Sequence, residues 1–197
     1  KTIEEPPVYA IIILLTENCD SLLPTIRSRC VTLTMNPVEK DKICTYLENK
    51  FQLEPEQAQI AANYCQGNIG KAIRFASSSD FIEMKNQVLK LLKNLDSMDI
   101  ASIIDTIKEF STHKNDINDY LDLMLLWYRD VLMFKVTKDA NLLLYSDEYS
   151  AISEQATKRD YENIENIIAA IDKAKVRLKA NVNFDVTIEL MILAMKD

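Results

Sequence analysis

Arg27, Ser28, Arg29 and Cys30 form the segment of this chain whose side chains are best suited to act on a ligand. They follow Pro24-Thr25-Ile26, which we expect to form a short helical turn, and they precede the apolar segment 31–35. An arginine fixed at the end of such a rigid element and directed outwards can reach the phosphate groups of a neighbouring molecule. The segment therefore has the layout of an arginine finger.

Two apolar segments flank this arginine pair and predict the elements that position it. Residues 8–16 are uncharged, rich in isoleucine and bounded by Pro7 and Asn18, which favours a buried parallel strand. Residues 31–35 predict a second strand. Because two strands do not make a stable sheet by themselves, we expect residues 1–35 to be the end of a larger α/β domain that begins before Lys1.

From residue 36 onward the hydrophobic pattern becomes helical. Asn36-Pro37-Val38-Glu39 predicts a helix start, with asparagine as the cap and proline at the first helical position. A second helix is expected to start at Glu54-Pro55 and to end before Gly67, and a third to run from Ile69 to Ser77. Residues 36–80 therefore predict a small three-helix unit.

The rest of the chain, residues 81–197, predicts a helical bundle. Apolar residues recur at helical spacing in segments 81–95, 98–110 and 115–136, in a long segment carrying residues 164–178, and in a last one carrying residues 186–194. We expect five main helices. Trp127 and Tyr128 are expected to fill the core, with Arg129 and Asp130 satisfying charge at its edge. The predicted fold class is mainly α with a short α/β remnant.

Composition excludes several kinds of site. The chain has 197 residues but only two glycines, too few for a glycine-rich phosphate loop. A net charge of -7 disfavours an autonomous nucleic-acid surface. The four cysteines lack metal-ligand spacing, so we expect no metal site and free thiols in a cytosolic protein. No apolar run predicts a membrane span, no signal peptide is expected, and His113 is expected to be a surface residue.

The N-terminal segment resembles a known family. Ile3-Glu4-Glu5-Pro6-Pro7, an apolar strand ending in threonine, and Leu22-Leu23-Pro24-Thr25-Ile26-Arg27-Ser28-Arg29-Cys30 are similar to the AAA+ subunits of sliding-clamp loaders of bacterial DNA polymerase III. The resemblance implies that residues 1–35 are the remnant of a RecA-like domain. Residues 36–80 would be its helical lid, and residues 81–197 a helical collar that oligomerises.

The resemblance also implies roles for single residues. The family's Ser-Arg-Cys motif falls on Ser28, Arg29 and Cys30, which makes Arg29 the trans-acting finger and leaves Arg27 a packing or salt-bridge role. Thr16 falls on the sensor-1 position. Gly70 stands where ATP-hydrolysing subunits carry the sensor-2 arginine. Each of these residues also has a purely structural alternative. Arg29 would be solvated or ion-paired, Thr16 would simply end a strand, and Gly70 would be a close-packing position.

The implied function is that of a clamp-loader subunit that does not hydrolyse ATP and supplies Arg29 to its neighbour. It implies no cofactor on this chain and ATP–Mg on the adjacent subunit. The implied partners are the tau/gamma ATPase and delta subunits, and through the complex the sliding clamp and primed DNA, in the bacterial cytoplasm. Two alternatives stay open: the tau/gamma ATPase subunit itself, and a stand-alone helical protein-interaction domain unconnected with ATP.

Overall fold

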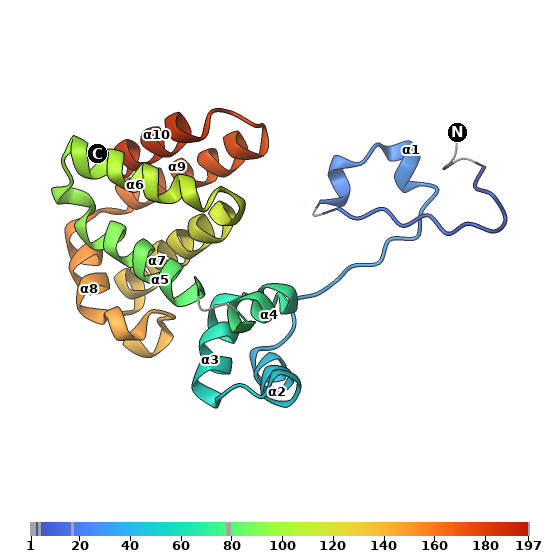
Figure 1. The fold of residues 1–197 in the computed structure, drawn as a ribbon, viewed down its shortest axis with the longest axis horizontal. Helices are drawn as coiled ribbons and strands as arrows, with labels where there is room; N and C mark the ends of the chain where they lie inside the picture. The colour runs from blue at the N-terminus through green and yellow to red at the C-terminus, as the bar shows by residue number, and fades with distance from the viewer. Residues whose placement is uncertain (1–2, 4, 17, 78–79, 197) are drawn as a thin grey trace. The chain divides into compact units, whose positions relative to one another are not determined.

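The computed structural model describes residues 3, 5–16, 18–77 and 80–196; Glu4 of the opening motif lies outside these ranges. The chain divides into two compact units, residues 1–37 and residues 38–197 (Figure 1). The described residues form ten α-helices and short 3-10 turns, without a β-strand. The predicted mainly α fold is confirmed.

The two strands predicted in unit 1–37 do not form in the described residues. Its regular elements are a 3-10 turn, η1 (Cys19–Ser21), and one short helix, α1 (Pro24–Arg27). The apolar segments on either side are solvent-exposed, with relative exposures of 106% for Val8 and 83% for Leu33. A strand is stabilised by hydrogen bonds to a neighbouring strand and by burial of a face, and these segments have neither within the described part of this unit.

Unit 38–197 opens with three short helices, as the sequence predicts. They are α2 (Lys40–Phe51), α3 (Pro55–Tyr64) and α4 (Ile69–Ser77), and they pack on one another. The predicted start of α3, with Pro55 at its first position, and the predicted bounds of α4 are confirmed. The start predicted at Asn36 is wrong, because the N–H of Val38 donates to the carbonyl of Gly67 at 3.0 Å and α2 begins only at Lys40.

Six helices follow, one more than the sequence predicts. They are α5 (Asp80–Asn94), α6 (Ile100–Thr112), α7 (Ile117–Thr137), α8 (Tyr149–Lys158), α9 (Tyr161–Lys179) and α10 (Phe184–Lys196). The missed helix is α8. It ends at Lys158, and the side chain of Asp160 then accepts a hydrogen bond from the N–H of Asn163 and starts α9. The boundary near residue 80 between a lid and a collar domain stays a prediction.

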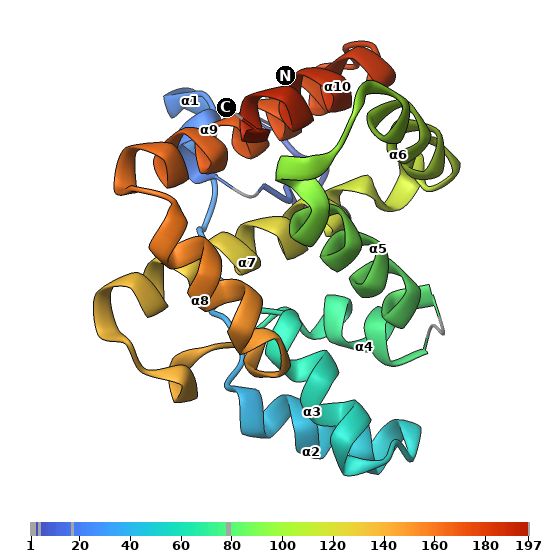
Figure 2. The ribbon, with the colours of Figure 1, turned by 90° about the vertical axis from the view of Figure 1, so that its left-hand side faces the viewer.

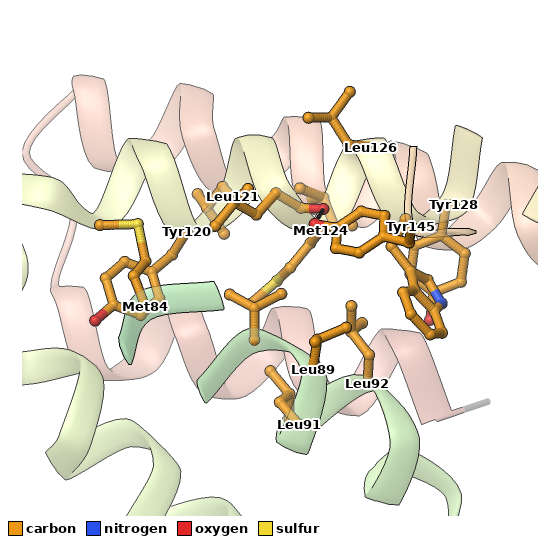
Figure 3. Close-up of a cluster of buried hydrophobic side chains, with 14 of the residues drawn as sticks. Met84, Leu89, Leu91, Leu92, Tyr120, Leu121, Met124, Leu126, Tyr128 and Tyr145 are labelled. Atoms are coloured by element: carbon orange, nitrogen blue, oxygen red, sulfur yellow. Dashed lines mark hydrogen bonds between the residues drawn. The ribbon is translucent and has the colours of Figure 1, made fainter. Parts of the chain in front are cut away.

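Helix α7 occupies the centre of the bundle (Figure 2), packed against α5, α8 and α9. Figure 3 shows Leu89 and Leu92 of α5 facing Met124 of α7, and all three are at least 94% buried. Trp127 and Tyr128 are fully buried, which confirms their predicted role in the core. Within the described ranges, no helix is both long and apolar enough to cross a membrane.

Two buried polar side chains tie the neighbours of α7 to it. Gln155 of α8 accepts a hydrogen bond from Trp127 Nε1 at 3.0 Å and donates one to the carbonyl of Leu92 at 2.9 Å. Asp130 accepts one from the N–H of Tyr145 at 2.8 Å and pairs with Arg129. Burial raises the pKa of the Asp130 carboxyl, although the Tyr145 N–H and Arg129 oppose that shift. Helices α5, α7 and α8 thus share one hydrogen-bonded frame.

We predict that Gln155→Ala destabilises the protein by about 2–4 kcal/mol, because it leaves two buried groups, the Trp127 N–H and the Leu92 carbonyl, without a partner. Urea denaturation monitored by far-UV circular dichroism measures the effect. The matched control is Glu154→Ala at the exposed neighbouring position, which should stay within about 0.5 kcal/mol of the wild type. Equal midpoints for the two variants would contradict a structural role for Gln155.

Candidate functional site

The segment leading to the arginines is organised by local hydrogen bonds. The Asn18 side chain accepts a hydrogen bond from the N–H of Asp20 at 2.8 Å and caps the turn η1. Thr16 Oγ1 donates to the carbonyl of Asn18 at 2.9 Å and accepts from its N–H at 3.2 Å. Thr16, the predicted sensor-1 residue, is exposed and lies in this turn. Its hydroxyl is engaged with its own backbone segment.

Helix α1 places the two arginines differently. Pro24 occupies its N-terminal turn, and backbone hydrogen bonds from Arg29 to Ile26 and from Cys30 to Arg27, 3.1 and 3.2 Å long, continue the turn beyond its end. Arg27 Nη1 pairs with Asp20 at 2.6 Å, which is the salt-bridge role predicted for Arg27. The turn therefore has a fixed shape at the point where Arg29 leaves it.

Arg29 lies on the surface of unit 1–37, next to exposed Ser28 and Cys30. Its Nη1 donates to the carbonyl of Thr25 at 2.7 Å, one helical turn back, which orients the guanidinium along α1. A guanidinium presents several N–H donors in a planar fork, and this fork matches the oxygens of a phosphate. The geometry is that of a cation held by a short helix at a solvent-accessible position.

The second predicted position, Gly70, lies in unit 38–197 at the start of α4. Gly67 has a φ of 81° and ends the turn after α3. Asn68 then caps α4, with its Oδ1 accepting from the N–H of Lys71 at 3.0 Å. Gly70 is exposed, and a β-carbon there would lie 3.3 Å from Asn68 Oδ1. A larger side chain at position 70 would therefore require the capping side chain of Asn68 to shift.

The positive charges of α4 are turned toward carboxylates of α7. We call Asp116, Asp119 and Asp122, spaced three residues apart, the α7 carboxylate row. Lys71 Nζ lies 3.3 Å from Asp119 and also bonds Asp122. Arg74 lies 2.6 Å from Asp119 and 3.9 Å from Asp116. Both cations of α4 are thus engaged by the bundle.

A lysine of α9 completes this network. Lys175 Nζ bonds the second oxygen of Asp122, so that Asp122 lies between Lys71 and Lys175. Burial opposes ionisation of Asp122, but its hydrogen bonds to the two lysines outweigh burial and lower the pKa of the carboxyl. Burial likewise disfavours the charged form of Lys71, and bonding to Asp122 and Asp119 reverses the effect and raises the pKa of the amine.

The predicted site residues are divided between the two units. Thr16, Ser28, Arg29 and Cys30 all belong to unit 1–37, whereas Gly70 belongs to unit 38–197. In the part of the chain that the structure describes, no group of three or more His, Cys, Asp or Glu side chains is arranged to hold a metal ion. His113 is half-buried, with its ring 5.8 Å from that of Tyr120, and its assignment as a surface residue stays a prediction.

Sequence reasoning missed the α7 carboxylate row. Its signal was present, because three aspartates at a spacing of three residues share one face of a helix, and so do Lys71 and Arg74. The pairing itself joins residues about 50 positions apart, which no local pattern reveals.

Known proteins match both the N-terminal segment and the whole length of the chain. The family model described as DNA polymerase III, delta subunit, matches residues 1–39, which include the Arg29 turn. The delta-prime subunit of DNA polymerase III from Bacillus subtilis (strain 168) is 30% identical over 200 residues, covering 100% of this chain and 60% of that protein. This chain is similar to a delta-prime subunit along its whole length. The resemblance inferred from the arginine motif is confirmed.

Two further relatives carry other subunit names. The tau subunit of Bacillus subtilis (strain 168) is 24% identical over 156 residues, covering 68% of this chain and 28% of that protein. The gamma subunit of Buchnera aphidicola subsp. Schizaphis graminum (strain Sg) is 21% identical over 217 residues, covering 98% of this chain and 59% of that protein. The delta-prime-like chain therefore spans at most 60% of these curated relatives.

The network around Asp122 gives a pH-dependent prediction for this delta-prime-like chain. The pKa of Asp122 is lowered from 3.8, so its ion pairs stabilise the fold above that pH and are lost as the pH falls through the folded-state pKa. Asp122→Asn should destabilise the chain by about 1 kcal/mol at pH 7, a value reduced because the side chain is one-third exposed.

Urea denaturation at a series of pH values measures this effect. The difference between the wild type and Asp122→Asn should narrow below pH 3.8. Asp172→Asn, at an exposed position of α9, is the matched control and should show neither effect. A difference that stays constant down to pH 3 would contradict the assignment.

Proposed function

We propose that this chain belongs to a delta-prime-type subunit of the DNA polymerase III clamp loader, which supplies Arg29 to ATP bound by an adjacent subunit. The observation that carries the proposal is the exposed Arg29 at the end of α1, inside the segment matched by the family model. The 30% identity to a delta-prime subunit supports the choice of subunit type.

In the proposed mechanism, Arg29 acts in trans. Its guanidinium would bind oxygens of the γ-phosphate and stabilise the charge that develops there during hydrolysis. The short α1 and the Arg27–Asp20 ion pair would hold the turn in shape, which lowers the entropy cost of placing the guanidinium. Ser28 and Cys30 would frame Arg29 in the turn, and Thr16 would occupy the sensor-1 position.

The chain itself would not hydrolyse ATP. Gly70 provides no side chain for a phosphate, and the two nearby cations of α4, Lys71 and Arg74, are already bonded to the α7 carboxylate row. Without a guanidinium at position 70, a bound γ-phosphate would lack a charged hydrogen-bond partner. In this proposal, ATP–Mg binds to the neighbouring subunit.

Helix α10 offers a surface for assembly. Val182, two residues before it, and Val186, Leu190 and Leu193 within it are exposed by 42–49%, and the three residues within the helix recur at helical spacing. We call these four residues the α10 stripe. Contiguous exposed apolar residues favour burial against a partner. We assign the stripe to contacts with the tau/gamma ATPase and delta subunits, in a complex that loads the sliding clamp on primed DNA in the bacterial cytoplasm.

The exposed apolar segments of unit 1–37 fit the same proposal. Residues 8–16 and 31–35 have strand-like composition, and their exposure leaves a large apolar surface in contact with water. We infer that they pair with strands of an α/β domain to which unit 1–37 contributes. Such pairing would bury their side chains and satisfy their backbone groups.

Two alternatives are less well supported. The tau/gamma ATPase subunit shares 24% identity in one relative, but Gly70 disfavours hydrolysis by this chain. A stand-alone helical interaction domain would be favoured by a buried, ion-paired Arg29, and Arg29 is exposed.

We predict that Arg29→Ala in the full-length protein lowers the DNA-stimulated ATPase rate of the reconstituted clamp loader by about tenfold or more. The reason is the loss of transition-state stabilisation, which reaches about a thousandfold in single-site nucleotide hydrolases. Arg29→Lys should restore little, because an ammonium group lacks the planar fork. Lys173→Ala, which removes a cation from an exposed position of α9, is the control and should retain the full rate. Unchanged ATPase with Arg29→Ala would refute the finger.

We predict that Leu190→Glu weakens binding to the other loader subunits by about tenfold or more, because a carboxylate would be buried in an apolar interface. Biolayer interferometry with immobilised tau/gamma or delta subunit measures the affinity. Asn166→Glu, which adds the same charge at an exposed position of α9, should bind as the wild type does. If both variants retain full affinity, the α10 stripe is not an assembly surface.

A further inference from the structure

A continuous series of ion pairs crosses from the three-helix unit into the bundle. Along this series, Arg74 contacts Asp116 and Asp119, Lys71 contacts Asp119 and Asp122, and Lys175 contacts Asp122. The two outer cations come from α4 and α9, whereas Asp119 and Asp122 come from α7 and Asp116 from the 3-10 turn directly before it. Three helices that are distant in sequence are thereby joined by alternating charges.

The series is electrically balanced, and its centre is partly shielded from water, whereas Arg74 and Asp116 at one end are about half exposed. Three carboxylates face three cations, so no net charge is buried. The Asp119 side chain is 7% exposed and that of Lys71 is 27% exposed, which places the centre of the series below the surface. Shielded ion pairs of this kind add little net stability, because desolvation offsets their attraction, but removing one partner is costly. Their main effect is to favour one geometry over others.

The other contact between α4 and the bundle is of a different kind. Phe75 of α4 stacks on Phe81 of α5 with ring centroids 4.3 Å apart, and Tyr64 of α3 lies 4.9 Å from the ring of Tyr145. Such aromatic contacts bury apolar area, and the hydrophobic part of their stabilisation is non-directional. The aromatic contacts therefore attach α4 to the bundle without fixing its orientation by themselves.

We propose that the α7 carboxylate row is an ionic latch that holds α4 in one orientation on the bundle. Lys71 is its central element, because it alone bonds both Asp119 and Asp122. Since α2 and α3 pack on α4, the latch fixes the orientation of the whole three-helix unit, residues 40–77. Lys175 extends the latch to α9. A displacement of α4 would therefore disturb ion pairs of both α7 and α9. The latch does not depend on the function proposed for Arg29.

Hydrogen–deuterium exchange of the full-length protein, resolved by mass spectrometry of peptides, tests the latch. Lys71→Met keeps the apolar stem of the side chain and removes its charge. It should raise amide exchange in α2, α3 and α4 by about tenfold or more, because Asp119 is left without one of its partners. Exchange in α8 and α10, which supply none of the three cations paired with the row, should change less than about twofold.

Two further variants complete the experiment. Lys108→Met breaks an exposed pair with Asp105 on α6 and should leave exchange in all these helices unchanged. Asp119→Asn removes a carboxylate of the latch on α7 and should reproduce the exchange pattern of Lys71→Met. It also provides the test if Lys71→Met folds poorly. Exchange that rises equally in α4, α8 and α10, or that does not rise in α4 for either variant, would overturn the latch.

Discussion

Burying helix α7 requires partners for its polar side chains, and the arrangement of residues 38–197 follows from that requirement. Trp127 Nε1 reaches Gln155 and so places α8, and Asp130 reaches the N–H of Tyr145 and so places the connection that precedes α8. At the other end of α7, Asp119 and Asp122 determine where α4 and α9 lie. Hydrophobic burial provides most of the driving force, but it is non-directional, so these polar contacts select the geometry.

The helices were predictable from sequence because their signals are local. The start of α3 follows from Glu54-Pro55, and the length of α7 follows from an unbroken helical period. The two failures have different causes, one long-range and one local. The predicted helix start at Asn36 is displaced by the hydrogen bond from Val38 to Gly67, and α8 was missed because a capping aspartate, Asp160, separates two helical segments without glycine or proline.

In the candidate site, too, the local turn was predictable from the sequence, whereas the long-range contacts were not. The turn around Arg27 and Arg29 follows from Pro24 and from its short length, and the salt bridge expected for Arg27 is made by Asp20, seven residues earlier. Local sequence does not determine the partner of Lys71, because Asp122 is 51 residues away and approaches only once α4 is docked on the bundle. The predicted strands 8–16 and 31–35 show the same limit, because a strand depends on a neighbour that the segment itself does not specify.

The hydrogen bond from the N–H of Val38 to the carbonyl of Gly67 fixes the segment before α2 on the turn between α3 and α4. Val38 is the first residue of unit 38–197, and this bond anchors it at the turn between α3 and α4 and not at the start of α2. The bond therefore lies one residue before Asn68, the cap of α4, and three residues before Gly70. The chain just before α2 is thus held at the N-terminal end of α4, whose cationic side chains Lys71 and Arg74 reach the bundle within the next two turns.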